Sequence, residues 1–106
     1  MKEDSLREFV LDQLDGLGAL ECRGMFGGHG FYCDGLFFGI LFEGRLYFKT
    51  DPASRKRYQA LGMKPFRPTP RQMLRTYYEV PATVLESTEQ LRDWARDAVA
   101  SRASRA

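Results

Sequence analysis

The sequence predicts an α+β domain in which helices at the beginning, middle and end of the chain flank an antiparallel β-sheet. Apolar residues near both ends recur at helical spacing, and Asp-Gly and Glu-Gly pairs separate apolar runs in the first half. The 106 residues are 43% hydrophobic, which is enough for one core. We therefore expect a single domain over residues 1–106, with the order α-β-β-β-α-β-α and a three-stranded meander plus one or two further strands.

Residues 5–15 are expected to form the first helix. Ser5 suits the N-cap, and Glu8, three positions later, completes a capping box. Apolar residues from Leu6 to Leu17 recur at helical spacing and give the helix one buried face. Gly16 is expected to end it, because glycine readily adopts the left-handed conformation of a C-terminal cap.

A short strand around Ala19–Arg23 is expected to lead into a glycine-rich stretch. The four glycines of this stretch should permit a tight turn or close backbone packing. A phosphate-binding loop is disfavoured, because the stretch lacks a Gly-Lys-Ser/Thr ending and leads into a strand rather than a helix. These glycines are Gly24, Gly27, Gly28 and Gly30.

A three-stranded antiparallel meander should follow. Turns at Asp34-Gly35 and Glu43-Gly44 separate expected strands at residues 31–33, 36–42 and 45–50. The middle run is apolar at nearly every position. We expect both faces of that strand to be covered, either by helices of the chain or by a partner chain.

Asp51-Pro52 is expected to open the second helix, which should run to about Leu61 and stop at Gly62. Three prolines between residues 65 and 70 predict an extended or looped segment over 64–69. A further strand is expected at Gln72–Val80, and Pro81 should end it.

The last helix is expected to begin near Ser87, with Gln90 completing a capping box. Its apolar residues have the spacing of one helical stripe, which should pack Trp94 on the sheet. Residues 101–106 are expected to form a frayed tail.

A cytoplasmic protein is expected. No apolar stretch approaches the roughly 20 residues of a membrane span, and the polar N-terminus lacks the apolar region of a signal peptide. The two cysteines are expected to be free thiols in a reducing compartment.

Little in the sequence indicates catalysis. Cys22, His29 and Cys33 lie close together, but their spacing matches no zinc pattern, so we expect no metal and no cofactor. A nucleophilic Cys33 or Ser54 would need a base within reach, and His29 is the only histidine. The expectation is a protein that is not an enzyme.

Charge is the strongest functional signal in the residues. From Lys49 to Arg75 there are eight basic residues and one acid, Asp51, although the net charge of the chain is only +2. Aromatic residues are interleaved with the basic ones. The segment suits a nucleic-acid surface, a docking surface for an acidic protein, or a solvated face. The candidate binding residues are Arg55, Lys56, Arg57, Lys64, Arg67, Arg71 and Arg75.

Several stretches resemble the N-terminal domain of the TfoX/Sxy family. The likeness runs from the first helix to the last, and two stretches are specific, Met25-Phe26-Gly27-Gly28 and Tyr77-Tyr78-Glu79-Val80-Pro81. The other matching residues are Arg23-Gly24, His29-Gly30-Phe31-Tyr32, Asp34-Gly35, Phe38-Gly39, Leu46-Tyr47-Phe48-Lys49-Thr50-Asp51, Tyr58, Gly62-Met63-Lys64-Pro65-Phe66, Met73 and Leu91–Ala98 with Trp94.

The resemblance implies an α+β fold related in plan to secretion chaperones and a regulatory, non-enzymatic role. Full-length members of the family regulate competence for DNA uptake, acting with a cyclic-AMP receptor protein at promoters and contacting protein partners. They carry a further C-terminal helical domain, and this chain is expected to be a stand-alone version of the first domain. The resemblance supplies no catalytic or ligand-binding residues.

Two functions are therefore expected. The first is a small bacterial regulator that docks a transcription-related protein and contacts DNA through Arg55–Arg57 and Arg67–Arg75. The alternative is a homodimeric structural or chaperone-like module without nucleic-acid contact, which the apolar strand Leu36–Phe42 favours. Neither function involves a membrane.

Overall fold

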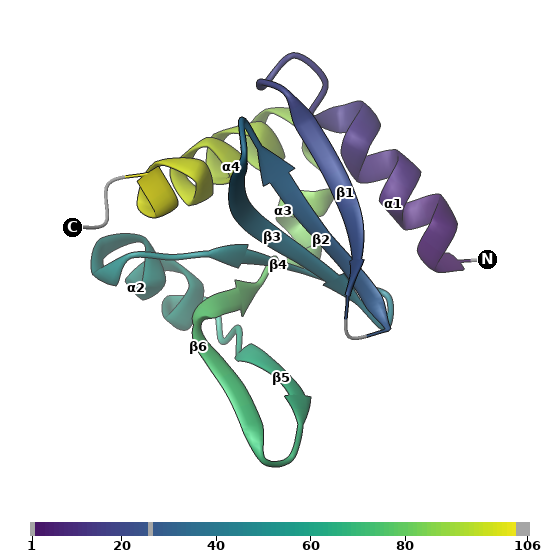
Figure 1. Cartoon of the computed structure of the whole chain (residues 1–106). Coiled ribbons are helices and arrows are strands. Elements are labelled where there is room, and N and C mark those ends of the chain that lie inside the picture. The colour runs from purple at the N-terminus through teal and green to yellow at the C-terminus, as the bar shows by residue number, and fades with distance from the viewer. Residues whose placement is uncertain (1, 26, 104–106) are drawn as a thin grey trace.

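The computed structural model describes residues 2–25 and 27–103, with side chains from residue 5 onward. It contains one six-stranded antiparallel sheet with the strand order β1-β2-β3-β4-β6-β5 (Figure 1), so the predicted α+β class is confirmed. The elements are α1 (Lys2–Gln13), β1 (Leu20–Met25), β2 (Gly28–Cys33), β3 (Leu36–Phe42), β4 (Arg45–Lys49), α2 (Pro52–Ala60), β5 (Pro65–Thr69), β6 (Gln72–Glu79), α3 (Ala82–Leu85) and α4 (Thr88–Ala103).

Two of these elements refine the expected order. The proline-containing segment after α2, expected to be extended or looped, pairs with β6 as strand β5. A one-turn helix, α3, follows Pro81, where only the end of a strand was expected. Pro81 has an extended backbone and directly precedes the first residue of α3. Because proline has no N–H, it cannot continue the β-ladder, but it can precede a helix.

Helix α1 starts earlier than the sequence pattern predicts. It begins at Lys2, so Ser5 lies inside the helix and the prediction that Ser5 is the N-cap is wrong. The predicted stop is confirmed, since Gly16 adopts the left-handed conformation with φ of 89° just after the helix.

Both predicted hairpin turns are confirmed. Asp34 and Gly35 have φ values of 52° and 83°, and Glu43 and Gly44 have 50° and 78°. Two consecutive positive values are typical of a type I′ turn, whose twist matches that of the flanking strands.

The glycine-rich stretch serves both predicted purposes. Gly27 has φ of 79° and forms part of the turn between β1 and β2. Gly28 and Gly30 lie within β2 and allow close packing: a Cβ on Gly28 would collide with the carbonyl oxygen of Leu41, and one on Gly30 with the sulfur of Met25. Phe26, between Met25 and Gly27, lies outside the described residues.

The helices cover one face of the sheet. The main core lies between that face and the helices, which approach from behind the sheet in Figure 1. It contains Val10 of α1, Phe38 of β3, Phe48 of β4, Leu91 of α4 and Tyr58 of α2, all almost fully buried. The sheet and helices therefore form the two layers expected of an α+β domain.

The opposite face of the sheet carries a second, smaller core. Ile40, Tyr47, Phe66 and Tyr77 are buried there, and none of them comes from a helix. The expectation that helices or a partner chain cover both faces of Leu36–Phe42 is thus corrected: helices cover one face, and residues of β5 and β6 cover the other.

Helix α4 packs its apolar stripe on β3 and β4, as predicted, but continues further than predicted. Its buried stripe is Leu91, Ala95, Ala98 and Ser101, whereas Trp94 lies beside the stripe and packs against Tyr58 of α2 with ring centres 4.7 Å apart. Trp94 therefore contacts α2 in addition to packing against the main core, to which strands β3, β4 and β6 contribute. The helix continues to Ala103 with Ser101 buried, so residues 101–103 are ordered helix instead of a frayed tail, and residues 104–106 lie outside the description.

Among the helices of the described residues, none has the length and apolar character that crossing a membrane requires.

Candidate binding surface

A hairpin of β5 and β6 carries most of the candidate basic residues and extends away from the rest of the sheet (Figure 1). We call residues Lys64–Tyr78 the basic hairpin, because they include four basic residues and no acidic one. Strand β5 is an edge of the sheet, which suits Pro65 and Pro68, since proline has no N–H to donate to a further strand. Pro70 and Arg71 form the turn between Thr69 and Gln72.

Aromatic residues anchor the base of the basic hairpin. Phe66 is completely buried, and its ring lies 4.8 Å from that of Tyr47 and 5.4 Å from that of Phe42. The hydroxyl of Tyr77 donates a hydrogen bond to the carbonyl oxygen of Phe37 at 3.2 Å. Burial raises the pKa of Tyr77 to about 12, so its hydroxyl stays protonated and able to donate at neutral pH.

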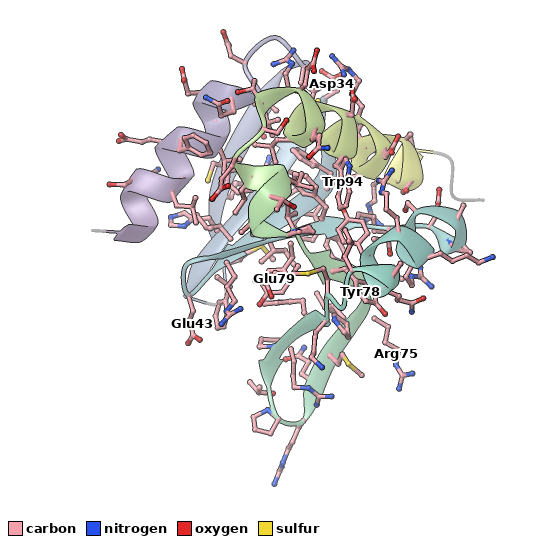
Figure 2. The ribbon with its side chains drawn as sticks, turned by 180° about the vertical axis from the view of Figure 1, so that it is seen from behind. Asp34, Glu43, Arg75, Tyr78, Glu79 and Trp94 are labelled. Atoms are coloured by element: carbon pink, nitrogen blue, oxygen red, sulfur yellow. The ribbon has the colours of Figure 1, made fainter. Side chains whose placement is uncertain are left out.

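The four cations of the basic hairpin fall into two groups. Arg67 is held within the hairpin, since its guanidinium donates to the carbonyl oxygen of Pro70 at 3.0 Å and to the sulfur of Met73 at 3.5 Å. Lys64, Arg71 and Arg75 are exposed, and none has an ion pair or side-chain hydrogen bond with another described residue. Figure 2 shows the Arg75 side chain pointing away from the molecule.

The second group of candidates lies on α2, whose start is fixed by the predicted cap. Asp51 accepts a hydrogen bond from the backbone N–H of Ser54 at 2.8 Å, and Ser54 Oγ accepts one from the N–H of Asp51 at 3.0 Å. The first of these bonds is the main cause of the lowered pKa of Asp51. Consecutive residues on a helix point about 100° apart, so Arg55, Lys56 and Arg57 face three directions.

Arg55 and Arg57 are engaged within the fold. Arg55 Nε donates to the hydroxyl of the buried Thr50 at 2.9 Å. The guanidinium of Arg57 stacks 4.1 Å from the centre of the Trp94 ring and bonds to Asp97 at 3.1 Å, which joins α2 to α4. Lys56 is exposed and has no ion pair among the described residues.

The seven predicted residues thus fall into two groups, according to whether their side chains are already bonded within the fold. Arg55 and Arg57 hold the fold together, and Arg67 shapes the basic hairpin. The predicted binding residues that make no such contact within the described part of the chain are Lys56, Lys64, Arg71 and Arg75. The aromatic residues interleaved with the basic ones were open to two interpretations in the sequence, as stacking surfaces for bases or as core residues, and the structure places Phe66 and Tyr77 in the core. That they anchor the basic hairpin was not predicted.

Two shallow pockets lie away from the basic hairpin. One, of about 370 Å³, lies between α2 and α4 and is lined by Asp51, Ser54, Arg57 and Asp97. The Asp51 carboxylate accepts a hydrogen bond from the Ser54 backbone N–H, and Arg57 pairs with Asp97. The other, of about 230 Å³, contains Cys33. Neither pocket presents a set of unbonded polar groups aimed at a ligand.

The candidate nucleophiles are placed unfavourably for catalysis. Burial, and secondarily the Asp34 carboxylate, raises the pKa of the Cys33 thiol, whereas a reactive thiolate needs a lowered pKa. The Ser54 hydroxyl is used in the cap of α2. Within the described part of the chain, no three His, Cys, Asp or Glu residues lie close enough together to hold a metal ion. Cys22, His29 and Cys33 therefore do not form such a group.

Comparison with known proteins identifies a family. Residues 12–102 match the family model described as the TfoX N-terminal domain. The match covers nearly the whole chain and includes both the basic hairpin and α2. No curated protein was found to match the chain.

Proposed function

The chain belongs to the TfoX N-terminal domain family, and on this premise we propose that it is a non-enzymatic regulatory module that docks a transcription-related partner through the basic hairpin. One observation carries the proposal: Lys64, Arg71 and Arg75 are exposed on a projecting hairpin and have no partners among the described residues. Three cations without internal partners form a surface that is complementary to a polyanion.

Duplex DNA is the polyanion that this hairpin fits best. A two-stranded β-ribbon fits the major groove of B-DNA, and arginine and lysine side chains neutralise phosphates along its borders. Arg71 lies at the turn of the hairpin and Arg75 points outward from β6, so the two side chains can reach separate phosphates. The buried ring of Phe66 fixes the base of the hairpin, which limits the entropy lost on binding.

An acidic protein surface is the second candidate partner. The same exposed cations complement carboxylates, and Lys56 on α2 supplies another exposed positive charge. Charge complementarity of this kind guides the orientation and the rate of docking.

Anisotropy titration of labelled mixed-sequence duplex DNA tests the proposal. If the three unpartnered cations of the hairpin contact phosphates, raising salt from about 50 mM to about 200 mM should weaken binding roughly 40-fold, because counterions are released on binding. Binding that does not respond to salt would contradict phosphate contact by the hairpin.

Absence of DNA binding at low salt would exclude DNA and leave the acidic protein as the partner. Partner capture would then compare the unmodified protein with an Arg71→Gln/Arg75→Gln variant. Loss of capture by the variant would support docking through the basic hairpin, and equal capture by both proteins would overturn it.

A further inference from the structure

The two edges of the sheet differ in how they are protected against pairing with another strand. Strand β5 forms one edge and carries Pro65 and Pro68. Strand β1 forms the other edge, and its residues, Leu20–Met25, include no proline (Figure 1). An unprotected edge is a template on which a further strand can pair.

Alternate residues of β1 point their backbone groups away from the sheet. The N–H of Asp34 donates to the carbonyl oxygen of Ala19 at 2.8 Å, and the β1–β2 ladder continues in the same register through Met25. Hydrogen-bonded positions alternate along an antiparallel pair, so the odd-numbered residues of β1 bond to β2. The even-numbered residues therefore direct their N–H and C=O groups outward, and outside the ladder no backbone hydrogen bond joins them to other described residues.

The edge strand carries one negative and one positive side chain on the same face. Arg23 Nη2 lies 2.8 Å from Glu21 Oε1, and both side chains are about 60% exposed. The Arg23 guanidinium also lies 4.5 Å from the centre of the Tyr32 ring on β2. These contacts hold the two charges against the sheet, two residues apart on its free edge.

We propose that β1 pairs antiparallel with β1 of a second copy of this chain, around a two-fold axis at Cys22. In this register Glu21 lies opposite Arg23 of the second copy, and Arg23 lies opposite Glu21. Both charge pairs occupy non-hydrogen-bonded positions, where opposing Cα atoms are about 4.5 Å apart and side chains interact most closely. The outward backbone groups of the even-numbered residues supply the hydrogen bonds.

The charges select this register from its neighbours. A two-fold axis at Glu21 would place two carboxylates opposite each other, and an axis at Arg23 would place two guanidinium groups opposite each other. A register shifted by one residue would place even-numbered residues of one copy opposite odd-numbered residues of the other. The backbone groups of the odd-numbered residues point toward β2, so the hydrogen bonds between the copies would be lost. Only the axis at Cys22 combines backbone pairing with two attractive charge pairs.

The dimer goes beyond the docking role of the basic hairpin and does not depend on it. Pairing at β1 doubles the six-stranded sheet and places the helices of both copies on the same side. Because β5 and β1 are opposite edges, the two basic hairpins lie at the outer ends of the combined sheet. A variant that breaks the β1 contact therefore leaves the charges of the hairpin unchanged.

Sedimentation velocity at tens of micromolar tests the dimer. The unmodified protein is expected at twice the 12.2 kDa of one chain. The Glu21→Arg and Arg23→Glu variants each place like charges opposite each other and should raise the dimer dissociation constant at least about tenfold. The double variant Glu21→Arg/Arg23→Glu restores opposite charges and should dimerise like the unmodified protein.

Gly24→Pro provides an independent test of the backbone contact. It removes an outward N–H that β2 does not use, and a Cβ at this position meets only the Gly28 carbonyl oxygen at 3.9 Å. We expect a folded monomer, verified by circular dichroism, while the Gly24→Ala control remains dimeric. A monomeric unmodified protein, or a folded Gly24→Pro variant that dimerises with unchanged affinity, would overturn the proposal.

Discussion

Phe66 of β5 packs edge-on against Phe42 of β3, with ring centres 5.4 Å apart, although β4 and β6 lie between their strands in the sheet. The sheet must therefore curl toward the face that the helices leave uncovered. The register shifts on both sides of Phe66 in the β5–β6 pairing accommodate this bend. The same contact fixes the direction in which the basic hairpin projects.

Replacing Phe66 by alanine should remove this anchor. Truncation of a fully buried phenylalanine costs about 3–5 kcal/mol, which is a large part of the stability of a small domain. Urea unfolding followed by circular dichroism measures the loss. Phe9→Ala is the matched control, because Phe9 is 40% exposed and its removal should cost about 1 kcal/mol or less. Equal losses in the two variants would show that Phe66 is not an anchor.

Arg57 and Lys56 are neighbours in sequence, but replacing them should change the stability of the fold by different amounts. Arg57→Ala removes the stacking on Trp94 and the ion pair with Asp97, and should cost about 1–2 kcal/mol of stability. Lys56→Ala removes only an exposed side chain and should change stability by less than about 0.5 kcal/mol. Thermal unfolding of both variants checks the difference, and a stability loss at Lys56 matching that at Arg57 would contradict the assignment.

Alkaline pH should destabilise the fold through Tyr77. Burial raises the pKa of Tyr77 from about 10 to about 12, so between these values the unfolded chain loses this proton while the folded protein keeps it. The contribution of Tyr77 to stability is complete below about pH 10 and is lost as the pH rises toward 12. Burial also raises the pKa of Tyr58, which adds an effect of the same sign.

Urea midpoints at about pH 8 and about pH 11 measure this dependence. The midpoint of the unmodified protein should fall at the higher pH, and the fall should be smaller in Tyr77→Phe, which retains the ring but cannot ionise. An identical fall in both proteins would show that Tyr77 does not contribute.

Local features of the structure follow from the sequence, whereas long-range contacts do not. The Asp34-Gly35 turn and the Asp51 cap depend on residues within a few positions of each other, so pattern alone predicts them. The partner of Arg57, Asp97, lies 40 residues away, and nothing near Arg57 in sequence shows that its charge is already paired. For the same reason, the basic segment could be recognised from its composition, but the cations free to bind a partner could not be separated from those that stabilise the fold.

DNA titration of two charge-matched variants tests the role of the basic hairpin most directly. Arg71→Gln/Arg75→Gln removes two positive charges from the hairpin. Arg45→Gln/Arg96→Gln removes two from elsewhere on the surface, where the two arginine side chains are 61% and 55% exposed and pair with Glu79 and Asp93. We expect the hairpin variant to lower the slope of log affinity against log salt by about 2, and the control to leave it nearly unchanged. Equal effects of the two variants would contradict docking through the basic hairpin, because binding would then depend only on total charge.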